Sequence, residues 1–208
     1  MIEFASADPS VVRAVRQREL LNAWLRALGG RHGLPLRGHY QPDRIADELI
    51  DMMEFDVHGD GEQARFLITH EGARLTTTYG NEDVEPAKRT NRWLEDAIGP
   101  DRYGHVVCLY RACVRHRRPA YSISTVQDAD GKDVAYERLL LPFGRDSRVE
   151  QIVGSYKTIS IEGGFKVANL MGLRPRAVPE IKVRAIIDQD FVRRRVDGET
   201  PGDLIEIS

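Results

Sequence analysis

The sequence predicts an α+β fold in which helices cover an antiparallel sheet. Two groups of strand-like segments predict it, a late trio over residues 119–159 and an early pair over residues 53–70. Between the two groups, the apolar side chains recur at helical spacing. We therefore expect a five-stranded antiparallel sheet with the intervening helices packed on one face.

The late trio shows the clearest alternation in the chain. Residues 119–127 alternate between larger and small polar side chains, and Asp130-Gly131 is a turn pair suited to positive φ. The alternation resumes over residues 132–141 and again over residues 149–158. Three long antiparallel strands present an apolar face that another element must cover.

The N-terminal segment predicts one amphipathic helix. Asp8 is a suitable cap and Pro9 suits the first helical position, while Gly29-Gly30 ends the pattern. The apolar stripe of this helix has to be buried, either on its own domain or against a second copy of the chain. The stripe residues that we expect in such a dimer are Leu21, Trp24, Leu25 and Leu28.

The other elements follow from shorter patterns. We expect them in this order: a short helix from Pro42, a hairpin over 53–57 and 64–70, a short helix over 73–79, helical turns around 93–98, a long helix over 102–116, and a last strand over 181–187. Residues 161–171 are predicted to form a short helix after the sheet.

The composition is that of a soluble globular protein. Of 208 residues, 41% are hydrophobic and 30% are charged, which argues against disorder, and the net charge of −2 argues against a protein that coats nucleic acid. We find no run of eighteen apolar residues and no signal-peptide pattern, so we expect a cytoplasmic protein without a membrane partner. Two cysteines are too few for a secreted disulfide scaffold.

Several motifs resemble the PAS domain family, and in particular a bacterial subfamily with a "YERLLLP" strand. The motifs that carry the resemblance, between about residues 18 and 160, are Trp24, Pro42-Asp43, Phe66–Gly72, Tyr79-Gly80, Pro119-Ala120-Tyr121, Tyr136–Pro142 and Val149–Gly154. The resemblance implies a PAS-like core at 41–160, preceded by a helix and connection at 1–40 and followed by an extension at 161–208. It also implies a non-catalytic sensory module, often a homodimer, that binds a small molecule or a protein partner.

Two alternatives remain open. Arg174, Arg176 and Arg193–Arg195 faintly resemble the arginines of a PilZ module, which would make the chain a receptor for a cyclic dinucleotide. A small enzyme of the same α+β outline is the other alternative. The chain has no Gly-x-Ser-x-Gly frame and no phosphate-binding Gly-Lys-Ser/Thr loop, so we name no catalytic residue.

If the sheet curls over the helices, inward-facing side chains line a cavity; the alternative is that they fill a solid core. The pocket candidates are Phe66, Ile68, Tyr79, Cys108, Tyr121, Ile123, Tyr136, Arg138 and Tyr156. The tyrosine hydroxyls and Arg138 would orient a ligand.

A PAS-like cavity raises the question of haem, flavin or a metal. His70 and His105 are the only positions that we consider as axial ligands to haem, and nothing beyond their position favours ligation. The spacing His105-x2-Cys108-x4-Cys113-x2-His116 does not form one zinc site, because the two histidines would lie roughly 16 Å apart along a helix. We therefore predict no metal site and leave the cofactor unknown.

Overall fold

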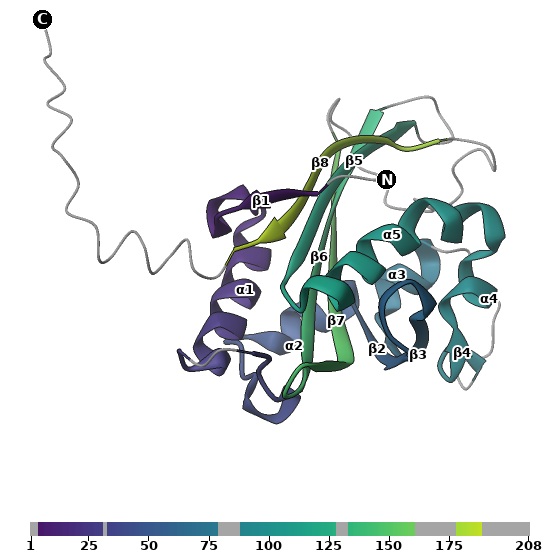
Figure 1. Ribbon diagram of the computed structural model, residues 1–208. Helices are drawn as coiled ribbons and strands as arrows, with labels where there is room; N and C mark the ends of the chain where they lie inside the picture. Colours follow the sequence, from purple (N-terminus) through teal and green to yellow (C-terminus); the bar gives the residue numbers. More distant parts are fainter. Residues whose placement is uncertain (1–3, 31–32, 79–87, 128–132, 161–177, 189–208) are drawn as a thin grey trace, which may run out of the picture.

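The molecule is built around one mixed sheet of eight strands. The computed structural model describes residues 4–30, 33–78, 88–127, 133–160 and 178–188, and the strands are ordered β1-β8-β5-β6-β7-β2-β3-β4 (Figure 1). The strand bounds are β1 Ala5–Ala7, β2 Met52–His58, β3 Arg65–Glu71, β4 Arg92–Trp93, β5 Ala120–Gln127, β6 Asp133–Arg145, β7 Arg148–Ser160 and β8 Glu180–Ile187.

Helices pack on both faces of this sheet. Figure 1 shows α3, α4 and α5 on one side and α1 on the other. The helix bounds are η1 Pro9–Val11, α1 Val15–Leu28, η2 Arg37–His39, α2 Ile45–Glu48, η3 Leu49–Asp51, η4 Gly61–Gln63, α3 Ala73–Thr78, α4 Leu94–Ile98 and α5 Pro100–His116.

The α+β class and the single sheet are confirmed. The early pair lies beside the late trio because β2 pairs with β7, for example Phe55 with Ile152, and all contacts among β5, β6, β7, β2 and β3 are antiparallel. The expected number of strands was wrong, because β1, β8 and β4 extend the sheet at its two edges. The β1–β8 pair is parallel, so the sheet is mixed.

The expectation that helices cover one face was also wrong. Each face of the sheet carries its own apolar core. On the α5 side, Phe55 and Phe66 pack with Tyr110; on the α1 side, Trp24 packs with Leu139 and its strand neighbours. Strand β6 is apolar at every position over residues 139–143, so its side chains make both faces of the sheet apolar. Each face therefore has to be covered by helices.

The N-terminal helix is split into two pieces. Asp8 does cap a helix, accepting a hydrogen bond from the Ser10 backbone N–H at 2.7 Å, but that helix is only the short η1. The backbone is extended again at Val12 and Ala14, and α1 then runs to Leu28, where Gly29 adopts the left-handed conformation (φ 60°).

The apolar stripe of the N-terminal helix, which was considered for a dimer, packs against the sheet of its own chain. Leu21, Trp24 and Leu28 are buried against the α1 face of the sheet, and Leu25 is partly buried beside them. The indole N–H of Trp24 donates to the Pro142 carbonyl at 2.7 Å. Of the two alternatives for covering the stripe, packing on its own domain is therefore the one observed.

The helices of the described segments are short relative to a bilayer. None of them combines the length and the apolar character that spanning a membrane requires.

Candidate functional site

Several buried polar side chains lie on the sheet face under α5. Ser122 on β5 lies opposite Arg138 on β6, and Arg138 lies opposite Tyr156 on β7. Residues directly opposite each other on paired strands point to the same face, so these three residues form a row across three strands. All three are buried. We call them, together with Tyr110, the α5-side polar cluster.

Tyr110 joins the row from the helix. Its hydroxyl lies 2.5 Å from the hydroxyl of Tyr156, and its ring packs against Phe55 and Phe66 with centroids 5.3 and 5.1 Å away. The Arg138 guanidinium carbon lies 5.9 Å from the Tyr110 ring centroid and 5.5 Å from that of Tyr156. A cation therefore lies over the faces of two aromatic rings whose hydroxyls are hydrogen-bonded to each other.

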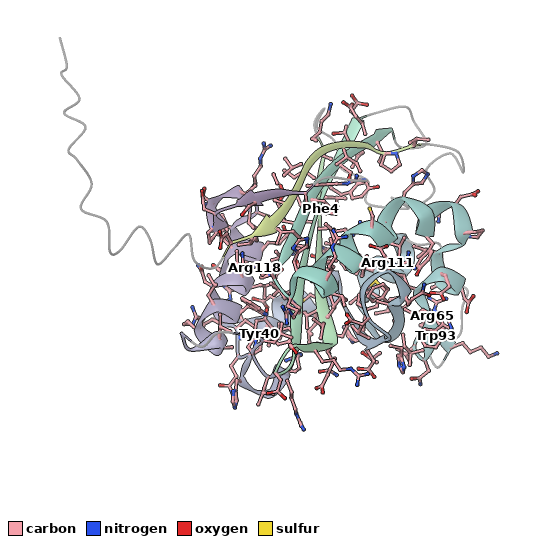
Figure 2. All side chains as sticks on the ribbon, viewed as in Figure 1. Phe4, Tyr40, Arg65, Trp93, Arg111 and Arg118 are labelled. Atoms are coloured by element: carbon pink, nitrogen blue, oxygen red, sulfur yellow. The ribbon has the colours of Figure 1, made fainter. Side chains whose placement is uncertain are left out.

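Helix α5 presents Tyr110 because of its sequence period. Val107, Tyr110 and Val114 recur at three- and four-residue spacing and are all buried, so they form the side of the helix that faces the sheet. Arg111, labelled in Figure 2, comes from the next position on the same helix and is only partly buried.

The electrostatics keep the tyrosines neutral. Burial raises the pKa of Tyr110, and the nearby Arg138 cation and the Tyr156 hydrogen bond offset part of this shift. Burial likewise raises the pKa of Tyr136, with Arg138 and Arg102 acting in the opposite direction. At neutral pH, these phenols are hydrogen-bond donors and acceptors, and Arg138 supplies a fixed positive charge. The cluster thus suits recognition of an acceptor-bearing group rather than proton transfer near pH 7.

Gly154 creates the space that Tyr156 occupies. A Cβ at position 154 would lie 2.7 Å from the Tyr156 hydroxyl and 3.0 Å from two ring carbons. The Tyr156 ring therefore lies back over Gly154, two residues earlier on the same face of β7. Any side chain at 154 would push the ring away from Tyr110.

The structure separates the pocket candidates into two faces. Tyr136, Arg138 and Tyr156 lie on the α5 face, and so do Phe66 and Ile68, which belong to the apolar core there. Cys108 is a half-buried residue of α5 whose thiol lies 3.8 Å from the His105 carbonyl. Tyr79 lies outside the described residues.

Tyr121 and Ile123 lie on the opposite face. Their cross-strand partners are Leu139 and Glu137, which point toward α1. The Tyr121 hydroxyl donates to the Glu137 carboxylate at 2.6 Å, and the Ala14 backbone N–H donates to the same oxygen at 3.1 Å. These contacts hold the start of α1 on the sheet, so the two residues share no site with the α5-side polar cluster.

The residues considered for haem or metal lie apart from the cluster. His105 is exposed on α5, and a ring nitrogen of His70 lies 3.3 Å from the Leu49 carbonyl, as expected for a strand-end residue near a turn. Cys113 is buried in the apolar core, where burial raises the pKa of its thiol. Among the described residues, no group of three or more His, Cys, Asp or Glu side chains is arranged to hold a metal ion.

The residues proposed to bind a cyclic dinucleotide differ from those of the α5-side polar cluster. Arg174, Arg176 and Arg193–Arg195 lie outside the described part of the chain, as does the helix expected over 161–171.

Tyr110, the central member of the cluster, was not among the pocket residues predicted from the sequence. The signal was present, since Tyr110 stands at helical spacing from Val107 and Val114 on the side of α5 that has to be buried. Ser122 was not predicted either. Because successive side chains of a strand point to opposite faces, Ser122 has to lie on the face opposite to its neighbour Tyr121.

No protein-family model matches the chain, and no curated protein matches it at a significant level.

Proposed function

We propose that this chain is a non-catalytic PAS-type regulatory module that binds a small molecule or a protein partner at the α5-side polar cluster. The observation that carries the proposal is the burial of this cluster. Ser122, Arg138, Tyr156 and Tyr110 are only 6%, 8%, 9% and 1% exposed. Burying a guanidinium costs several kcal/mol even after relaxation, so a sheet face that merely supports a helix would be more stable with apolar residues there. Proteins depart from such rules mainly at functional sites.

The arrangement of elements supports the same proposal. Strands β2 and β3 are bonded to the trio β5–β7, and α3, α4 and α5 lie between the two groups in sequence and over one face in space. This is the plan that the resemblance to PAS domains implies. The sheet departs from that plan in having the further strands β1 and β8 on one side and β4 on the other.

The chemistry of the cluster indicates what it would recognise. Arg138 offers a positive charge and several N–H donors, and the hydroxyls of Tyr110 and Tyr156 can donate or accept. A ligand with a carboxylate, carbonyl or other acceptor group fits this set, placed among the apolar rings of Phe55 and Phe66.

The first experiment asks whether the purified protein carries a ligand. Its visible absorption reports haem or flavin, and mass spectrometry of the supernatant after denaturation reports any other small molecule. A thermal-shift screen of organic acids and cyclic dinucleotides then tests added ligands. Because a ligand that binds only the folded state raises the melting temperature, a saturating ligand at about 100 times its Kd should stabilise the protein by about 2.7 kcal/mol.

The second experiment places the ligand at the cluster. Arg138→Met should abolish retention of the ligand, or its thermal shift, and circular dichroism checks that the variant is folded, since removing one member of a buried polar interaction also lowers stability. Arg18→Met, the same change on the exposed side of α1, is the matched control and should behave as wild type. A ligand that binds Arg138→Met as it binds wild type would refute this assignment of the site.

We also expect a homodimer, and its contact surface has to differ from the stripe first considered. Leu21, Trp24 and Leu28 are already packed on the sheet of their own chain. Sedimentation of the wild-type protein at several concentrations measures the dimer directly, and a monomeric mass throughout would remove this part of the proposal.

A further inference from the structure

A concave site lies beside the turn of the β6–β7 hairpin. The loop that carries η2 and the end of the β6–β7 hairpin line a pocket of about 280 Å³. Tyr40, labelled in Figure 2, marks this end of the molecule. The residues that line the pocket include Arg37, Gly38, His39, Phe143, Arg145 and Glu150. Phe143 and Tyr40 belong to the core on the α1 side, so this pocket is separate from the α5-side polar cluster.

A β-bulge shapes one wall of the pocket. Phe143 pairs with Gln151 and Gly144 pairs with Val149, so Glu150 is the extra residue of the bulge. A Cβ at Gly144 would lie 1.9 Å from the Arg148 carbonyl oxygen, so the bulge requires glycine there. The Gly144 backbone N–H donates to the Pro35 carbonyl at 3.1 Å, which ties the hairpin to the loop before η2.

The floor of the pocket holds one guanidinium in place. Arg37 donates to the Glu54 carboxylate at 2.6 Å, and its guanidinium carbon lies 5.4 Å from the Tyr40 ring centroid and 5.8 Å from that of Phe143. The two rings pack on each other at 5.0 Å. The Nε–H of Arg37 is nevertheless buried with no acceptor within the part of the chain that the structure describes. A ligand in the pocket does not reach an atom with less than 1 Å² exposed, so it would meet the Arg37 guanidinium through its other N–H groups.

The rim adds further cationic groups. Arg145 and His39 are exposed, and Arg145 makes no ion pair with any described residue. Glu150 is the one acidic residue that lines the pocket, and Glu54 beneath it is already engaged by Arg37. The guanidinium groups of Arg145 at the rim and of Arg37 in the pocket lining both favour an oxyanion.

We propose that this pocket is a binding site for a small organic oxyanion, a carboxylate or phosphate ester, whose oxygens meet the guanidinium groups of Arg145 and Arg37. The volume equals that of about nine water molecules in the liquid, which admits a single ring or a short chain with one charged group. The site does not depend on the proposed regulatory function, since it lies on the other side of the sheet.

Gly38 provides a way to close the pocket without disturbing the fold. A Cβ added at Gly38 meets no atom within 4 Å, and its φ lies outside the left-handed region. A leucine at this lining position should therefore be accommodated without a clash and narrow the space left for a ligand. Gly104, an exposed glycine of α5 whose added Cβ also meets nothing, gives the matched control Gly104→Leu.

The experiment is an NMR titration of the full chain with phenyl phosphate, benzoate, inorganic phosphate and the neutral benzyl alcohol. Phenyl phosphate or benzoate should shift the amide signals of Gly38 and Gly144 with a Kd no weaker than about 10 mM, and benzyl alcohol should not. A response to phenyl phosphate alone assigns phosphate esters, and a response to benzoate alone assigns carboxylates. Arg145→Gln should weaken binding by about tenfold, the loss of one charge-assisted contact.

The variants decide the outcome. Gly38→Leu should abolish the shift at Gly144 while its other amide signals stay those of a folded chain, and Gly104→Leu and Arg138→Met should bind as wild type. The proposal is overturned if neither aromatic anion shifts these amides, if inorganic phosphate binds equally well with no effect of Gly38→Leu, or if Arg145→Gln binds unchanged.

Discussion

Trp24 tests whether α1 belongs to the core of its own chain. Its side chain is fully buried on the α1 face of the sheet, and its indole N–H donates to the Pro142 carbonyl at 2.7 Å. Truncating a buried tryptophan to alanine costs about 3–5 kcal/mol, and the carbonyl left without its donor adds about 1–3 kcal/mol. Trp24→Ala should therefore lower the free energy of unfolding by about 5 kcal/mol, a large share of the 5–15 kcal/mol typical of a domain.

Urea denaturation at two protein concentrations is the assay. If α1 packs within the chain, the loss of stability is the same at both concentrations, whereas a stripe buried between two copies gives a midpoint that rises with concentration. Trp93→Ala is the control: Trp93 is half-buried at the edge strand β4, under the Arg65 guanidinium at 4.0 Å, and its loss should cost only about 1 kcal/mol (Figure 2). A Trp24→Ala cost no larger than that of Trp93→Ala would refute the packing argument.

Three further outcomes are expected. Tyr156→Phe leaves the buried Tyr110 hydroxyl without its partner at 2.5 Å and should cost about 1–3 kcal/mol, while the double variant with Tyr110→Phe should cost less than the sum of the two single changes in a denaturation cycle. Burial raises the pKa of folded Tyr110 above its unfolded value of about 10, so the resulting stability is complete below about pH 10 and is lost as the pH rises further; denaturation across this range should show a shallower loss for Tyr110→Phe than for wild type. Lys157→Met removes the ammonium that lies 2.6 Å from Glu48 and 2.8 Å from Asp51, two buried carboxylates; because Arg74 still pairs with Asp51 at 2.8 Å, the change should cost about 1–3 kcal/mol, chiefly at Glu48, by calorimetry at neutral pH.

The long strands could be predicted from the sequence because alternation is a local property. Strands β5, β6 and β7 carry it over eight to thirteen residues, and β8 carries it over Glu180–Ile187. Strand β1 has only Ala5–Ala7, with no β-branched or aromatic residue, and β4 has only Arg92–Trp93. These two strands exist because a partner strand is there to bond them, and that partner is remote in sequence.

The site was predictable only in part for a related reason. The period of two places Tyr136 and Arg138 on one face of β6. Which residues of β5 join them depends on the register between the strands, and a shift of one residue exchanges the faces. Register pairs Ser122 with Arg138, so Tyr121 and Ile123 point to α1 instead. The width of an apolar helical stripe likewise does not tell whether a sheet or a second copy covers it.

The edge strand β1 and its neighbour β8 come from opposite ends of the described chain and lie side by side (Figure 1). During synthesis on the ribosome, Ala5–Ala7 emerges well before Glu180–Ile187, the strand with which it pairs. Contacts between such distant positions form late and slow folding, because a long loop has to close before they are made. The nascent chain should therefore assemble its central strands first and acquire this edge last.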